Sequence, residues 1–387
     1  MTKSSSLPGG RDSNLRVLRG ASTVYNECAP DSAGSNNAAF RTNAQIFNPR
    51  TGRNVPIPVP TIPAGQHLVS GLCTVGGDAD HIRVFYVVTM STPSSGLTPE
   101  SRTTTIFAFD PFAPGQPQTV PLPDGIDIAH ISNLLPTDYG FILAVWSNTG
   151  QYIGFDGATL AQTFSIPVPM MWTFANSRGI LVTRNSDRTI YDARDGQVIG
   201  HVDGSNVNNP SDTYPDGFIV NTATLHDGHY DSGYFNLTDR QLKTPFPGGG
   251  DVWAQKFLAL GDHSLTIRNL MDNSVIFQRD GAEYDGLHIS NAYIAGNYLY
   301  IANDSDSPVI DVTSSQKVSS DWKVRPTDAV GRDWVLVKTE NHASRSDGSC
   351  FSTETATSRY DDNALTCNPS DVTLRYAPGG KYDGPWY

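Results

Sequence analysis

A histidine-containing segment occurs twice in the 387-residue chain, and it offers the best candidates for chemistry. Residues 124–133 read DGIDIAHISN and residues 280–291 read DGAEYDGLHISN, so one motif recurs with a two-residue offset. Imidazole and carboxylate groups can hold a metal or polar ligand, or exchange protons. The predicted binding residues are therefore His130, His288, Asp127 and Asp285. The alternative is that the repeat keeps its histidine to hydrogen-bond a neighbouring backbone.

Two further loops are rich in oxygen ligands, at residues 227–231 and 303–306. Ca²⁺ prefers several such oxygens within one loop, but neither loop matches an EF-hand. We predict no cofactor, with Ca²⁺ as the possible exception; ordinary Asp and Asn turns explain both loops equally well. The sequence holds no nucleophile elbow, HExxH motif, P-loop or dinucleotide fingerprint. Sites assembled from separate loops leave no such motif, so the sequence does not decide whether the chain is an enzyme.

Net charge argues against nucleic acid as a partner, and the lengths of the apolar runs argue against a membrane-spanning helix. With 39 acidic and 27 basic residues the net charge is −12, which disfavours binding to nucleic acid. No apolar run approaches the roughly 20 residues of a transmembrane helix. The first residues are polar and rich in Gly and Ser, without the apolar region of a secretory signal. We expect a secreted or cell-envelope protein whose signal or anchor is absent from this chain; a cytoplasmic protein is the alternative.

The four cysteines support the extracytoplasmic expectation. None forms a CxxC pair or has a histidine at zinc-finger spacing, so a structural metal site is disfavoured. We predict two disulfides, Cys28–Cys73 and Cys350–Cys367, because the flanking sequence is typical of loops. The alternative is four buried free thiols in a cytosolic protein.

A repeated hairpin signature predicts the elements that would position these residues. Short runs of β-branched and aromatic residues end at an Asp or Asn turn, and a second short run follows. Seven turns share this pattern, 33 to 62 residues apart, and 372–378 forms a weaker eighth unit. The seven turn residues are Asn48, Asp110, Asp156, Asp192, Asn236, Asn269 and Asp311.

The fold class follows from this period. Before many of these hairpins, a turn leads into an apolar strand such as 139–146 or 178–183, which we expect to be the second strand of each unit. His130 and His288 lie 158 residues apart, about four units of roughly 40 residues. We predict an all-β β-propeller with seven, alternatively eight, four-stranded blades. Residues 1–14 are expected to be a flexible segment and 15–387 a single propeller domain. In the seven-blade arrangement the two irregular end units combine into one blade closed by strands from both termini.

The chain resembles the β-propeller superfamily, most closely the quinoprotein (PQQ-repeat) and WD40-like propellers. The resemblance covers residues 15 to 378 and is architectural, because the Trp-Asp and Gly-His signatures of WD40 blades and the Gly-Gly pair of kelch blades are missing. No functional residue is carried over from these families. Three insertions interrupt the repeat, at 29–41, 90–102 and 341–368, and are expected to be surface loops.

Two functions follow from these observations. The first is an extracytoplasmic module that binds a protein or carbohydrate partner, since repeats and insertions dominate and no catalytic motif occurs. The alternative is an enzyme, a polysaccharide lyase or a lactone or glycoside hydrolase, with a His/Asp site at the channel mouth. A quinoprotein dehydrogenase ranks third, because a stacking Trp and the polar ligands of that cofactor cannot be placed.

Overall fold

The structure is a computed structural model of the whole chain, and its description covers most of residues 39–339 with shorter segments on either side. The described ranges are 4–5, 7–8, 15–18, 23–26, 28–30, 39–78, 80–113, 115–124, 126, 130–146, 150–168, 173–184, 187–203, 213–214, 217–226, 229–243, 250–253, 256–261, 263–270, 272–281, 292–301, 307–331, 333–339, 364–367 and 372–377. Within them the protein is all-β, and no helix is long and apolar enough to cross a membrane.

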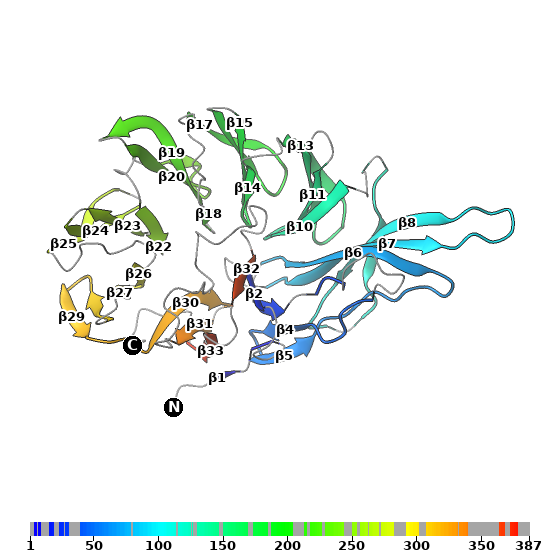
Figure 1. Ribbon diagram of the computed structural model, residues 1–387, viewed down its shortest axis with the longest axis horizontal. Coiled ribbons are helices and arrows are strands. Elements are labelled where there is room, and N and C mark those ends of the chain that lie inside the picture. Colours follow the sequence, from blue (N-terminus) through cyan, green and yellow to red (C-terminus); the bar gives the residue numbers. More distant parts are fainter. Residues whose placement is uncertain are drawn as a thin grey trace.

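Six sheets follow one another along the chain, each a meander of four antiparallel strands. In Figure 1 these sheets stand side by side around a common centre, which is the arrangement of a β-propeller. Their strands are β6 (His67–Gly76), β7 (Arg83–Thr92), β8 (Ser101–Phe109) and β9 (Gln118–Pro121); β10 (Ile131–Thr137), β11 (Gly140–Trp146), β12 (Gly150–Asp156) and β13 (Gln162–Val168); β14 (Thr173–Ala175), β15 (Gly179–Arg184), β16 (Asp187–Asp192) and β17 (Val198–Asp203); β18 (Thr213–Tyr214), β19 (Gly217–His226), β20 (His229–Asn236) and β21 (Gln241–Leu242); β22 (Gly250–Trp253), β23 (Lys256–Gly261), β24 (Ser264–Asn269) and β25 (Val275–Asp280); and β26 (Ala292–Ala295), β27 (Tyr298–Ile301), β28 (Val309–Asp311) and β29 (Gln316–Ser319).

Two further sheets close the ring, and each contains strands from both ends of the chain. One has the order β32-β2-β3-β4-β5 and the other β1-β33-β31-β30. Closure by both termini therefore occurs in two sheets, whereas the sequence suggested one shared blade. The strands are β1 (Ser4–Ser5), β2 (Leu15–Leu18), β3 (Val24–Asn26), β4 (Gln45–Asn48), β5 (Arg53–Pro56), β30 (Val324–Val330), β31 (Trp334–Thr339), β32 (Ala364–Cys367) and β33 (Val372–Tyr376).

The predicted Asp and Asn turns connect the last two strands of the sheets. In six of them the side-chain oxygen accepts the backbone N–H two residues later, at 2.7–3.1 Å. This bond replaces a ladder hydrogen bond as the chain reverses. Four residues after every turn position for which that residue is described, the backbone is left-handed, which favours Gly there, as at Gly52 with φ +68°. The sequence repeat therefore arises from one turn structure, with the same side-chain hydrogen bond and the same left-handed residue, that recurs in successive sheets.

Apolar residues fill the space between neighbouring sheets. The second strands carry the most buried runs; Phe141 to Val145 of β11, for example, are all at most 3% exposed. One disulfide, Cys28–Cys73, joins the loop after β3 to β6 of the next sheet. It confirms one of the two predicted pairs. Cys350 of the other pair lies outside the described residues, and of Cys367 only the backbone in β32 is described.

The prediction of an all-β propeller is confirmed. The described strands form eight sheets, and the number of blades, seven or eight, stays a prediction. The insertion at 90–102 differs from a surface loop. There β7 and β8 continue outward to Thr92 and Ser101, because the β-branched run 103–105 extends the ladder. Within the segment 1–14, Ser4–Ser5 pair with β33 and Leu7 is buried.

Candidate functional site

Of the four predicted binding residues, the structure describes one. His130 directly precedes β10, the strand of its sheet nearest the centre of the ring in Figure 1, and its side chain is exposed. Asp127, Asp285 and His288 lie outside the described residues, as do the whole oxygen-rich loop 303–306 and Asp227 of the other loop. Their convergence on a ligand stays a prediction. Among the described residues no three His, Cys, Asp or Glu side chains gather as metal ligands would.

A cavity of about 210 Å³ lies between the first two sheets of the chain. Three connections form it: the β4–β5 turn, the β6–β7 loop and the β8–β9 turn. Apolar side chains contribute to its lining, and charged groups of both signs surround them. The lining residues are Pro49, Arg50, Asp80, His81, Ile82, Arg83, Asp110, Phe112 and Ala113.

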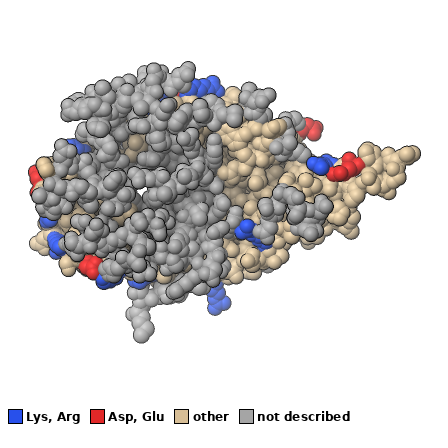
Figure 2. Space-filling view, in the orientation of Figure 1, with Lys and Arg blue, Asp and Glu red and all other residues tan. Residues whose placement is uncertain are grey.

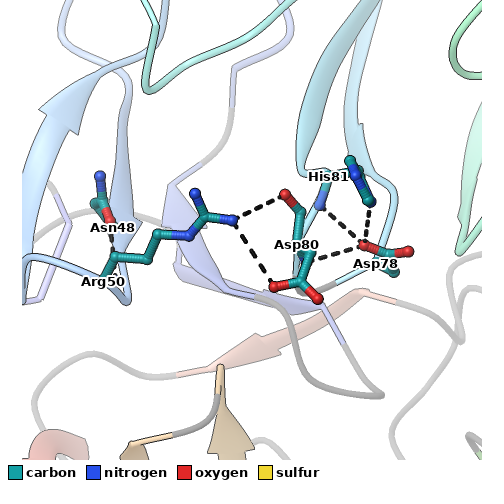
Figure 3. Close-up of polar contacts among 5 residues, drawn as sticks. All are labelled: Asn48, Arg50, Asp78, Asp80 and His81. Atoms are coloured by element: carbon teal, nitrogen blue, oxygen red, sulfur yellow. Dashed lines mark hydrogen bonds and ion pairs between the residues drawn. The ribbon is translucent and has the colours of Figure 1, made fainter.

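The β6–β7 loop is organised by Asp78 (Figure 3). Its Oδ1 accepts the backbone N–H of Asp80 and of His81, each at 2.9 Å, and lies 3.0 Å from Nδ1 of His81. Burial alone would raise the pKa of Asp78, but these hydrogen bonds and the nearby imidazole outweigh it and hold the pKa below its ordinary value. When Nδ1 donates this bond, Nε2 of His81 is left as a proton acceptor.

Arg50 crosses from the neighbouring sheet to this loop (Figure 3). Asn48 fixes the turn that carries it, because its Oδ1 accepts the N–H of Arg50 at 3.0 Å. The Arg50 guanidinium donates to the carbonyl of Asp80 at 3.0 Å and lies 3.8 Å from its carboxylate. Side-chain exposures of 68% for Arg50 and 50% for Asp80 leave both charges accessible to a ligand.

The β8–β9 turn supplies the third wall. Asp110 accepts the N–H groups of Phe112 and Ala113 at 2.8 and 3.0 Å, which holds the half-buried Phe112 against the cavity. Arg83, at the start of β7, donates to Gln118 of β9 at 3.2 Å. Each wall is therefore anchored by hydrogen bonds to its own turn or strand, so the cavity is preformed.

The described lining combines charged and apolar groups. Two guanidinium groups and two carboxylates surround Phe112 and Pro49, which suits a ligand that presents an apolar group with charges beside it. His81, oriented by Asp78, is the group that could accept a proton.

Sequence reasoning missed this site because its residues come from three connections in two sheets. A signal was nevertheless present in the β6–β7 connection. There the sequence GDADHI (77–82) is longer and more charged than the corresponding two-residue turn between β10 and β11, at Asp138 and Tyr139. The extra residues form the wall that carries Asp80 and His81.

Comparison with known proteins returns likenesses of fold only. No family model and no curated protein matches the chain. Among solved structures, BamB from Moraxella catarrhalis is 13% identical, covers 95% of this chain and 99% of its own, and has a TM-score of 0.37. The dihydro-heme d1 dehydrogenase NirN in complex with DHE is 11% identical and has a TM-score of 0.39; the match covers 82% of this chain and 65% of NirN. Hsv2 of Kluyvelomyces marxianus is 10% identical and has a TM-score of 0.34; the match covers 66% of this chain and 86% of Hsv2.

Proposed function

We propose that the chain is an extracytoplasmic binding module that recognises a protein partner at the cavity between its first two sheets. The observation that carries the proposal is the preformed lining, in which the exposed Arg50 and Asp80 flank the apolar Pro49 and Phe112. A protein segment offers both charges and an apolar side chain at once. A carbohydrate would more often meet a stacking Trp or Tyr, and neither is among the described residues that line this cavity.

The disulfide supports the extracytoplasmic part of the proposal. Cys28–Cys73 joins two sheets, and such bonds persist in oxidising compartments. Mass measurement of the native protein after alkylation, with and without reductant, tests this part. Incorporation of alkyl groups at Cys28 and Cys73 without reductant would contradict it.

Site-specific photo-crosslinking tests the binding role. A photoreactive phenylalanine at Ala113, on the cavity rim, should form a defined adduct in extracts of the source cells. The same group at Ser314, which occupies the equivalent position of the β28–β29 turn, should form none. Arg50→Glu should remove the Ala113 adduct. Identical adducts from both positions would overturn the proposal of a protein-binding cavity. So would binding of the native chain to a glycan array that is lost in Arg50→Glu.

His81 supports a second candidate, a hydrolase or lyase that uses this imidazole as its base. The supporting observation is the 3.0 Å contact between His81 Nδ1 and Asp78, which orients the ring. Turnover of lactones or acidic polysaccharides that is lost in both His81→Gln and Asp78→Asn would favour the enzyme. Turnover that survives both changes would exclude His81 as the base.

A further inference from the structure

The hairpin of β7 and β8 extends far beyond β9, and β6 accompanies β7 only as far as Ser91. The two strands pair along their whole length, from Val84 with Phe109 out to Thr92 with Ser101. Strand β9 covers β8 only from Thr105 to Ala108, so the outer part of the hairpin projects without that neighbour. Figures 1 and 2 show this projection as an arm that leaves the ring sideways. We call residues 90–102 the arm.

The end of the arm is a tight, ordered turn. Ser95 and Thr98 exchange two backbone hydrogen bonds, at 3.1 and 3.0 Å. Gly96 takes the positive φ (+60°) required at the first central position of a type II′ turn, a geometry that matches the twist of the strands. Leu97 follows at the second central position and is completely exposed, at 104%. The arm thus presents one leucine on a preorganised support.

The rest of the arm does not explain this leucine. Met90 at the base of the arm is buried in the core, but from Ser91 to Arg102 the side chains other than Leu97 and two prolines are polar, and Glu100 is paired with Arg102 at 3.1 Å. An apolar side chain on such a tip gains nothing for folding, whereas burial in a partner would remove it from water. A rigid apolar anchor also loses little conformational entropy on binding.

We propose that the arm docks Leu97 into the cavity of a second copy of this chain, in a head-to-tail contact. The cavity offers Pro49, Ile82 and Phe112 to an apolar side chain. The Arg50–Asp80 pair of the cavity is 68% and 50% exposed, and the Arg102–Glu100 pair near the tip is 58% and 49% exposed, so each pair can meet the opposite charge of the other beside the apolar contact.

The geometry of one sheet makes this contact heterologous, which means that two different surfaces of the chain meet, the arm of one copy and the cavity of another. Because β6 to β9 form an antiparallel meander, the β7–β8 connection and the β6–β7 loop lie at opposite ends of it. Arm and cavity therefore cannot meet within one molecule's sheet, but each molecule can offer its arm to one neighbour and its cavity to another. Such contacts generate chains or rings. This inference rests on the proposed function of the cavity and names one partner for it.

Sedimentation of the full-length protein, with the chain as its own probe, tests the proposal. Over roughly 10–500 µM, the range suited to a small transient contact, we expect dimers and longer species. Leu97→Asp removes the anchor and Ala113→Arg blocks the cavity rim, and each should weaken self-association at least tenfold. Leu97→Met and Ser314→Arg are the matched controls and should associate like the native chain. Circular dichroism and urea midpoints verify that each variant folds.

Mixing the two blocked variants is the decisive measurement. The Leu97→Asp copy retains its cavity and the Ala113→Arg copy retains its arm, so one intact contact remains and the mixture should form dimers but nothing longer. A native chain that stays monomeric, variants that associate like it, or a mixture without dimers would overturn the proposal. If self-association fails while the Ala113 crosslink captures a different protein, the proposed function of the cavity stands and the second copy is excluded as its partner.

Discussion

At the scale of single residues, the Asp and Asn turn positions combine two properties. Their side-chain oxygens satisfy backbone N–H groups that the reversing chain removes from the ladder. When the residue is Asp, the bond also depends on pH. Burial acts to raise the pKa of Asp156, but hydrogen bonds from the Thr159 hydroxyl, the N–H of Thr159 and the N–H of Ala158 hold it below its ordinary value. Asn at the same place accepts the bonds without a charge, as Asn236 does.

Asp156→Asn should therefore change how stability depends on pH. Because the folded pKa of Asp156 is lowered, its contribution is complete above the unfolded pKa of about 3.8 and is lost as pH falls through the folded value. The variant should be less stable by roughly 0.5 kcal/mol at pH 7, since water screens most of the charge, and equal to the native chain near pH 2. Urea unfolding between those values measures the difference. A constant difference at all pH values would contradict the assignment; Asn236→Asp should introduce the same slope.

Left-handed residues of the same turns give a second prediction. A Cβ at Gly52 would lie 2.4 Å from the Trp334 ring, whose Nε1–H donates to the carbonyl of Pro49 at 3.0 Å. Gly52→Ala should cost about 2 kcal/mol or more, from the positive φ and from displacement of the indole. Ser315 has φ +56° at the equivalent position and is exposed, so Ser315→Gly should be neutral or stabilising by up to about 1 kcal/mol.

Urea unfolding measures the change in stability for both substitutions. A shifted midpoint with an unchanged m-value shows that stability alone has changed. Equal effects of the two changes would show that the turn geometry is not shared between these sheets.

At the scale of elements, local patterns predicted well and non-local assemblies did not. The turn at Asp110 and the apolar strand 139–146 were recognisable because a turn bond and a buried strand each leave a mark within a few residues. The cavity was missed because Arg50 and Asp80, 30 residues apart, meet only when two sheets pack. The sequence also did not predict that β1 joins the last sheet and β32 the first. These pairings depend on where the two chain ends lie in space, which no local pattern encodes.

Loss of the disulfide should weaken the junction between the first two sheets. Cys28 and Cys73 are 45 residues apart, so their bond restricts a long loop in the unfolded chain. The double variant Cys28→Ala, Cys73→Ala should lose about 2–4 kcal/mol of unfolding free energy. Urea unfolding of the variant and of the reduced native chain separates the crosslink from side-chain packing. A reduced native chain as stable as the oxidised one would show that the bond contributes nothing.

At the scale of the whole molecule, the ring depends on the seam between its first and last sheets. One apolar cluster spans that seam: Val24 and Phe47 belong to the first sheet, and Trp334 and Leu374 belong to the last. Leu7 joins the same cluster and is 9% exposed. The Trp334 indole also donates to the turn that carries Arg50, so closing the ring positions one wall of the cavity.

Leu7→Ala tests whether this closure stabilises the entire ring. Truncating a buried leucine typically costs about 2–5 kcal/mol, and we expect a loss near the lower limit because Leu7 lies close to the surface. The loss should shift the whole unfolding transition, because each sheet covers the apolar faces of its neighbours and an open seam exposes two of them. Leu97→Ala, the same change at a fully exposed leucine, should stay within about 0.5 kcal/mol. Urea unfolding followed by tryptophan fluorescence and by circular dichroism compares the two variants. If Leu7→Ala were as harmless as Leu97→Ala, the N-terminal residues would not contribute to closing the ring, and the cavity wall at Pro49 and Arg50 would owe its position to Trp334 and the disulfide alone.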